Sequence, residues 1–143
     1  MAEDENRRSA EHVVRLVHEP HENGLSCQWL DQGVFWEGGS DAKNQEDAHS
    51  WKDRFTAFVA ELRADLGNPD LTIIMVMLGD LDEKVAMKYP YWQAVRAQQH
   101  AVNIPGVTKI EANGYERKAD GIHFTTKGQL AFGAALAGLL PAP

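Results

Sequence analysis

The segment 71–78, LTIIMVML, is an almost unbroken apolar run. A strand with one face in water alternates apolar and polar residues, whereas a parallel strand covered by helices on both faces is apolar throughout. The segment 49–69 before it has the spacing of an amphipathic helix, with one apolar face made of Trp51, Phe55, Phe58, Val59, Leu62 and Leu66. The two segments together predict a buried central strand preceded by a covering helix.

The rest of the chain continues this alternation. Apolar spacing and turn residues predict strands at 33–36 and 107–112, and helices at 10–17, 91–102 and 126–140. The last helix carries Leu130, Ala134, Ala137 and Leu140 on one side. Strands that alternate with helices favour right-handed crossovers and a parallel sheet. We therefore expect an α/β fold of three layers (αβα) with a small parallel sheet, in a single domain over residues 1–143.

The charge balance excludes some classes of partner. Fourteen Lys and Arg against twenty-one Asp and Glu give a net charge of -7, the wrong sign for a protein that binds nucleic acid or an anionic membrane surface. The N-terminus lacks the apolar core of a signal peptide, and no apolar run is long enough to span a bilayer. The single cysteine, Cys27, fits a reducing compartment. We expect a cytoplasmic chain as the sequence is written, without a cofactor or a metal.

An aspartate and a histidine follow the last predicted strand in the stretch KADGIHFTTKG, residues 118–128. In a parallel α/β sheet, reactive groups gather on the loops beyond the carboxyl ends of the strands. A serine hydrolase needs an imidazole that accepts the hydroxyl proton and a carboxylate that fixes the tautomer of the imidazole. Asp120 and His123 have a spacing that suits this pair, although Asp-x-x-His alone is a weak motif.

The nucleophile is harder to find. The chain has the serines Ser9, Ser26, Ser40 and Ser50 and the single thiol of Cys27. Ser50 is expected to cap the helix that begins near Trp51. Only Ser40 lies in a glycine-rich loop, EGGSDA, beyond the carboxyl end of a predicted strand. If the chain has its own nucleophile, it is Ser40; the alternative is an ordinary loop serine.

Several segments resemble one family in the same order along the chain, from about residue 33 to 140. GVFWEGGSDA (33–42), YPYWQAVRAQQHAV (89–102) and DGIHFTTKGQLAFGAAL (120–136) are similar to the sialate O-acetylesterase and acetylxylan esterase branch of the SGNH hydrolases. The resemblance implies a flavodoxin-like fold and hydrolysis of small acyl esters or acetylated sugars. It implies Asp120 as the orienting acid and His123 as the general base.

The resemblance also assigns the loop after the first predicted strand to the active site. Trp36, Glu37, Gly38 and Gly39 would line it, and the backbone N–H of Gly38 would be an oxyanion donor. Members of the branch have a Trp-x-Gln-Gly-Glu-x-Asp pattern here, whereas this chain has Glu37 in place of Gln and Gly39 in place of Glu.

The branch places its nucleophile in a Gly-Gln-Ser-Asn type of turn after an earlier strand, and no such turn precedes Gly33. This predicts a fold truncated at the N-terminus, with the nucleophile supplied either by Ser40 or by a missing segment. The alternative is an inactive relative that acts as a binding or assembly module. A missing first strand would leave an open sheet edge, and open edges pair with other chains. We therefore expect a homodimer or other self-association through this edge.

Overall fold

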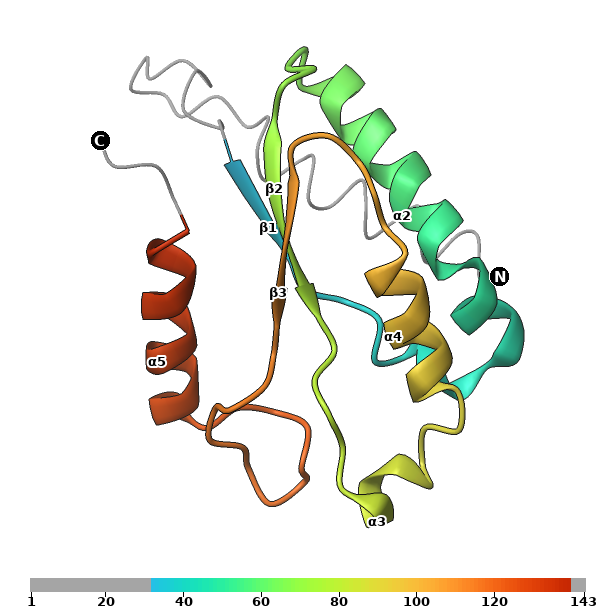
Figure 1. Cartoon of the computed structure of the whole chain (residues 1–143), viewed down its shortest axis with the longest axis vertical. Helices are drawn as coiled ribbons and strands as arrows, with labels where there is room; N and C mark the ends of the chain where they lie inside the picture. The colour runs from blue at the N-terminus through green and yellow to red at the C-terminus, as the bar shows by residue number, and fades with distance from the viewer. Residues whose placement is uncertain (1–31, 140–143) are drawn as a thin grey trace, which may run out of the picture.

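The structure is a computed structural model that describes residues 32–139 (Figure 1). The predicted helix at 10–17 and three of the candidate nucleophiles, Ser9, Ser26 and Cys27, lie outside the described residues. Among residues 32–139, no helix combines the length and the apolar character needed to cross a membrane.

The described residues contain a parallel sheet of three strands in the order β1-β2-β3. The strands are β1 (Gln32–Phe35), β2 (Thr72–Met77) and β3 (Val107–Glu111). Gly33 pairs with Ile73 between β1 and β2, and Ile73 pairs with Val107 between β2 and β3. The predicted central position of the apolar strand is confirmed, because β2 has a partner on both edges.

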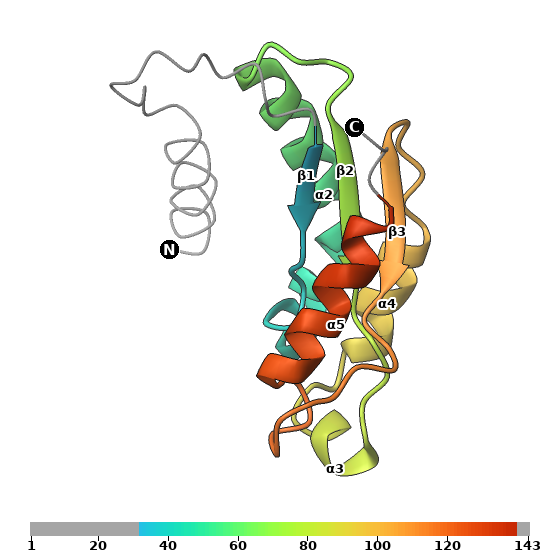
Figure 2. The same cartoon turned by 90° about the vertical axis from the view of Figure 1, so that its left-hand side faces the viewer.

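Helices cover both faces of the sheet. Helices α2 (Gln45–Asp65) and α4 (Trp92–His100) lie on one face, and α5 (Thr126–Ala137) lies on the other (Figures 1 and 2). A 3-10 turn, η1 (Asp41–Lys43), precedes α2, and a short helix, α3 (Glu83–Ala86), follows β2. The three-layer αβα fold predicted from the sequence is confirmed.

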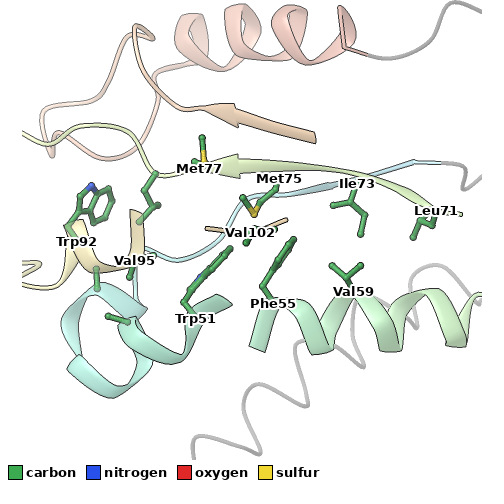
Figure 3. Close-up of a cluster of buried hydrophobic side chains, with 13 residues drawn as sticks. Trp51, Phe55, Val59, Leu71, Ile73, Met75, Met77, Trp92, Val95 and Val102 are labelled. Carbon is green, nitrogen blue, oxygen red and sulfur yellow. The ribbon is translucent and has the colours of Figure 1, made fainter. Parts of the chain in front are cut away.

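The larger part of the core lies between β2 and the α2–α4 layer. Trp51, Phe55 and Val59 of α2 point toward β2, which presents Ile73 and Met75 to them (Figure 3). All five side chains are at most 4% exposed. The helical spacing that predicted this apolar face was therefore correct. Burial of each large side chain contributes about 1.5–3 kcal/mol.

Helix α2 begins at Gln45, six residues before the start expected near Trp51, and Ser50 does not cap it. The side chain of Asn44 accepts hydrogen bonds from the backbone N–H groups of Glu46 and Asp47, at 2.8 and 3.3 Å. Ser50 lies inside the helix, where its hydroxyl donates to the carbonyl of Glu46 at 2.8 Å. The expected cap was therefore wrong: asparagine is as favoured a cap as serine, and the helix begins after Asn44.

Helix α5 presents a different face to the sheet from the one formed by Leu130, Ala134 and Ala137. Leu130 is 72% exposed, whereas Phe132 is 3% exposed. The cause is a close contact at Gly128, where a Cβ atom would lie 2.2 Å from the carbonyl oxygen of Glu116. This contact requires glycine and turns the helix so that Phe132 faces the core.

Candidate active site

The three strands end at the same edge of the sheet, and the loops that follow them meet there (Figure 1). The loop after β1 contains residues 36–40, the loop after β2 begins at Leu78, and the loop after β3 contains Asp120 and His123. Ligand sites in open α/β sheets lie at this edge.

Asp120 and His123 form a direct pair. Nδ1 of His123 lies 2.7 Å from Oδ2 of Asp120, while Oδ1 of Asp120 accepts the backbone N–H groups of Ile122 and His123, each at 2.9 Å. One carboxylate oxygen thus shapes the turn and the other orients the imidazole. Both side chains are accessible, with 46% of Asp120 and 73% of His123 exposed. The predicted pairing of these two residues is confirmed as geometry.

The charge state of Asp120 determines the tautomer of His123. The hydrogen bond from the His123 side chain, followed by those from the N–H groups of Ile122 and His123, holds the pKa of Asp120 well below its usual range. Asp120 is therefore a carboxylate at neutral pH and accepts a hydrogen bond from the Nδ1–H group of His123. Nε2 is then left with its lone pair in the neutral imidazole, which is the state that a general base requires.

Aromatic side chains connect the loop after β1 with the Asp120–His123 turn. The ring centroid of Trp36 lies 4.9 Å from that of Phe124, the residue after His123, and 5.1 Å from that of Phe132. Tyr115, which lies in the loop after β3, contacts the rings of both phenylalanines. Trp36 thus packs against the residue that follows His123 and is 40% exposed; its place in the lining of the active site stays a prediction.

A buried glutamine, which was not among the predicted site residues, holds the backbone of the loop next to Gly38. Gln99, a fully buried residue of α4, donates from Nε2 to the carbonyl of Glu37 at 3.1 Å and accepts the N–H of Leu78 at 2.8 Å. Because the two sides of a trans peptide point in opposite directions, the N–H of Gly38 points away from Gln99. It has no hydrogen-bond partner among residues 32–139.

Gly38 itself could not carry a side chain in this conformation. Its φ is 128°, and a Cβ atom would lie 3.0 Å from Nε2 of Gln99 and 3.1 Å from Val95. Glycine adopts such a conformation without the strain of a Cβ atom. The position supports the predicted use of the Gly38 N–H as a donor, which stays a prediction.

Ser40 is exposed and lies directly before η1, where its carbonyl accepts the N–H of Lys43 at 3.2 Å. Its hydroxyl forms no hydrogen bond with His123, and Nε2 of His123 has no hydrogen-bond partner among residues 32–139. The role of Ser40 as nucleophile therefore stays a prediction.

The neighbouring acidic residues differ in their surroundings. Burial, and then the charge of Asp41, raises the pKa of Glu37. Asp41 itself pairs with Arg54 of α2 at 2.5 Å. No group of three or more His, Cys, Asp or Glu side chains in the described part of the chain is arranged to hold a metal ion.

A shallow hollow of about 650 Å³ lies at the start of α2 rather than at the candidate pair. Its lining residues are Lys43, Asn44, Gln45, Glu46, His49 and Tyr91. Neither Asp120, His123 nor Ser40 takes part. We place the candidate site at the pair because a carboxylate orients the imidazole of His123, whereas Nδ1 of His49 in the hollow lies against the backbone carbonyl of Gln45 at 2.7 Å.

A comparison with known protein families gives a match over most of the chain. The family model described as "carbohydrate esterase, sialic acid-specific acetylesterase" matches residues 11–140. The chain belongs to this carbohydrate esterase family. The resemblance found from the sequence is thereby confirmed.

A curated relative and a solved structure agree with this assignment. A probable carbohydrate esterase of Arabidopsis thaliana is 29% identical over 127 residues, which are 88% of this chain and 46% of the relative. The X-ray structure of this Arabidopsis protein is similar with a TM-score of 0.65 and 30% identity, over 73% of this chain and 41% of the solved chain. The chain thus spans about half the length of this carbohydrate esterase relative.

Proposed function

We propose that this carbohydrate esterase chain takes part in the hydrolysis of acetyl esters on sugars by a serine hydrolase mechanism. The observation that carries the proposal is the hydrogen bond of 2.7 Å between Nδ1 of His123 and Oδ2 of Asp120. Family membership supports the substrate class, because the family is one of acetylesterases.

In the proposed mechanism, Nε2 of His123 accepts the proton of a serine hydroxyl as its oxygen attacks the ester carbonyl. Asp120 keeps Nδ1 protonated and stabilises the imidazolium that forms. The N–H of Gly38 donates to the carbonyl oxygen, where negative charge develops. His123 then gives the proton to the departing sugar oxygen, and the acetyl group stays bonded to the serine oxygen. His123 next accepts a proton from a water molecule that attacks this ester, and returns it to the serine oxygen as acetate leaves.

Two sources of the nucleophile fit this scheme. Ser40 is the candidate within the described residues, since it follows the same strand as Trp36 and Gly38. The other source is a serine outside residues 32–139. Trp36, Glu37 and Gly39 would line the binding surface for the sugar in either case.

The test is hydrolysis of p-nitrophenyl acetate, followed by acetate release from an acetylated sugar. We expect turnover by the native chain, a loss of at least about 100-fold with His123→Ala, and native activity with His100→Ala. His100 is an exposed histidine at the end of α4 and serves as the matched control.

The outcomes separate the alternatives. Native activity in Ser40→Ala would eliminate Ser40 as the nucleophile, and labelling by a fluorophosphonate would then identify the reactive serine. No turnover above the His123→Ala background would contradict the esterase proposal and would favour the binding or assembly module.

A further inference from the structure

Arg117 lies in the segment between β3 and α5 and directs its guanidinium into the group of loops at the sheet edge. Nη1 donates to the carbonyl oxygens of Asp80 and Gly121, and Nη2 donates to that of Ala112 at 3.0 Å. The Nη1 distance to the Gly121 oxygen is 3.2 Å. Three backbone carbonyls thus share one side chain, and that of Asp80 lies 37 residues away along the chain.

The three carbonyls belong to the loops that form the candidate site. Asp80 follows β2, Ala112 follows β3, and Gly121 stands between Asp120 and His123. Arg117 therefore connects the Asp120–His123 turn directly to the carboxyl ends of the two strands.

The backbone is shaped to admit the guanidinium. A Cβ atom at Gly79 would lie 2.5 Å from Nη2 of Arg117 and 2.5 Å from the carbonyl oxygen of Ala112. On the other side, a Cβ atom at Gly121 would lie 2.8 Å from Val85 of α3. Glycines at both positions let the loops approach each other around Arg117.

Arg117 pairs with no carboxylate among residues 32–139, since its hydrogen bonds go to carbonyl oxygens. Its two Nη atoms are already engaged by the protein, so they are poorly placed to bind a substrate carboxylate. A guanidinium presents donors in a rigid planar fork, whereas the ammonium of lysine is a single point charge. This arrangement fits a part in positioning rather than in binding.

We propose that Arg117 is a positioning residue that holds the Asp120–His123 turn against the carboxyl ends of β2 and β3. Its effect on catalysis rests on the proposed function, but its effect on the place of the turn does not. The two can therefore be tested apart.

The test compares Arg117→Lys with Arg96→Lys. Arg96 is the matched control because it pairs with the carboxylate of Asp80 in the same group of loops but makes no hydrogen bond to the Asp120–His123 turn. The structural readout is the NOE between the Hα protons of Gly121 and the methyl groups of Val85, which are in close contact. We expect a strong NOE in the native chain and in Arg96→Lys, and a weak or absent one in Arg117→Lys.

The kinetic readout is the hydrolysis of p-nitrophenyl acetate. A displaced base lowers kcat more than it changes KM. We expect Arg117→Lys to lower kcat by about tenfold or more with KM within about twofold of the native value. Arg96→Lys should keep both constants near the native ones.

The outcomes distinguish this inference from the proposed function. An inactive native chain whose NOE is lost in Arg117→Lys would refute the function and support the inference. An active chain with the same NOE and kcat in Arg117→Lys would overturn the inference alone.

If Arg117→Lys does not fold, a measurement on the native chain still tests the proposal. Restricted rotation of the Arg117 guanidinium, seen as separate Nη proton signals at low temperature, is expected, and signals averaged like those of exposed arginines would overturn the proposal.

Discussion

Glu37 lies where the loop after β1 leaves the sheet, at the position for which the family pattern has glutamine. Burial, and then Asp41, raises its pKa above the ordinary value of 4.5. The folded chain therefore holds the Glu37 proton more tightly than the unfolded chain does. Once the pH rises above 4.5, Glu37 ionises more readily in the unfolded chain than in the folded chain, so the free energy of unfolding falls.

Glu37→Gln is accordingly predicted to stabilise the fold at pH 7. The gain in the free energy of unfolding is below about 1 kcal/mol because solvent screens this partly exposed group. It should disappear as the pH falls below 4.5, where Glu37 is protonated in the folded and in the unfolded chain. Urea denaturation at pH 7 and pH 4 measures this. Exposed Glu61→Gln gives the size of an ordinary surface change, and a gain that persists at pH 4 would contradict the prediction.

Gln99 shows what a buried amide contributes to the site. Replacement by leucine would leave the N–H of Leu78 and the carbonyl of Glu37 without partners in the interior. Each unpaired buried group costs about 1–3 kcal/mol.

We expect Gln99→Leu to lower the free energy of unfolding by about 2–4 kcal/mol. The control is Gln93→Leu on the exposed side of α4, which should change it by less than about 0.5 kcal/mol. Equal effects in chemical denaturation would show that the two hydrogen bonds of Gln99 do not support the loop.

The sequence could predict the Asp120–His123 pair but not Gln99, and the reason is distance along the chain. Asp120 shapes its own turn through residues at most three positions away, so the pairing follows from local spacing. The partners of Gln99 lie 21 and 62 residues away. A glutamine in a helix gives no sequence signal of such contacts.

At the scale of the elements, the strands and most helical faces follow from their apolar pattern, whereas α5 does not. Its composition is apolar on several sides, so periodicity does not choose among them. The choice comes from Gly128, which packs against the backbone of Glu116. A contact between two backbone segments forms only in the folded chain. The sequence shows the glycine but not the segment that it contacts.

Two glycines of α5 allow this interpretation to be tested. A Cβ atom at Gly128 would lie 2.2 Å from the oxygen of Glu116, while nothing lies within 4 Å of one at Gly133. We predict that Gly128→Ala lowers the free energy of unfolding by at least about 2 kcal/mol, since overpacking displaces the backbone. Gly133→Ala should raise it by about 0.5–1 kcal/mol through helix propensity. Thermal denaturation of both variants measures the contrast, and a neutral Gly128→Ala would contradict the assigned contact.

At the scale of the whole molecule, the sheet has one edge strand on each side, and the two edges differ. The edge of β1 that faces away from β2 pairs with no strand among residues 32–139, and Val34 in this strand is 57% exposed. β3, the other edge strand, carries polar Thr108 and Lys109. Unpaired strand edges with apolar side chains favour pairing with another chain, while lysine discourages it.

The self-association expected from the sequence therefore stays a prediction, and β1 is its proposed surface. Sedimentation velocity at micromolar concentration should show a dimer or a larger species of the native chain. Val34→Lys should shift the distribution toward the monomer, because a charge at an edge strand opposes pairing. Lys52→Val, a change at a site on α2 away from the sheet edge, serves as the control and should leave the distribution unchanged. A native chain that sediments as a well-behaved monomer would refute the prediction, and an unchanged dimer in Val34→Lys would place the interface elsewhere.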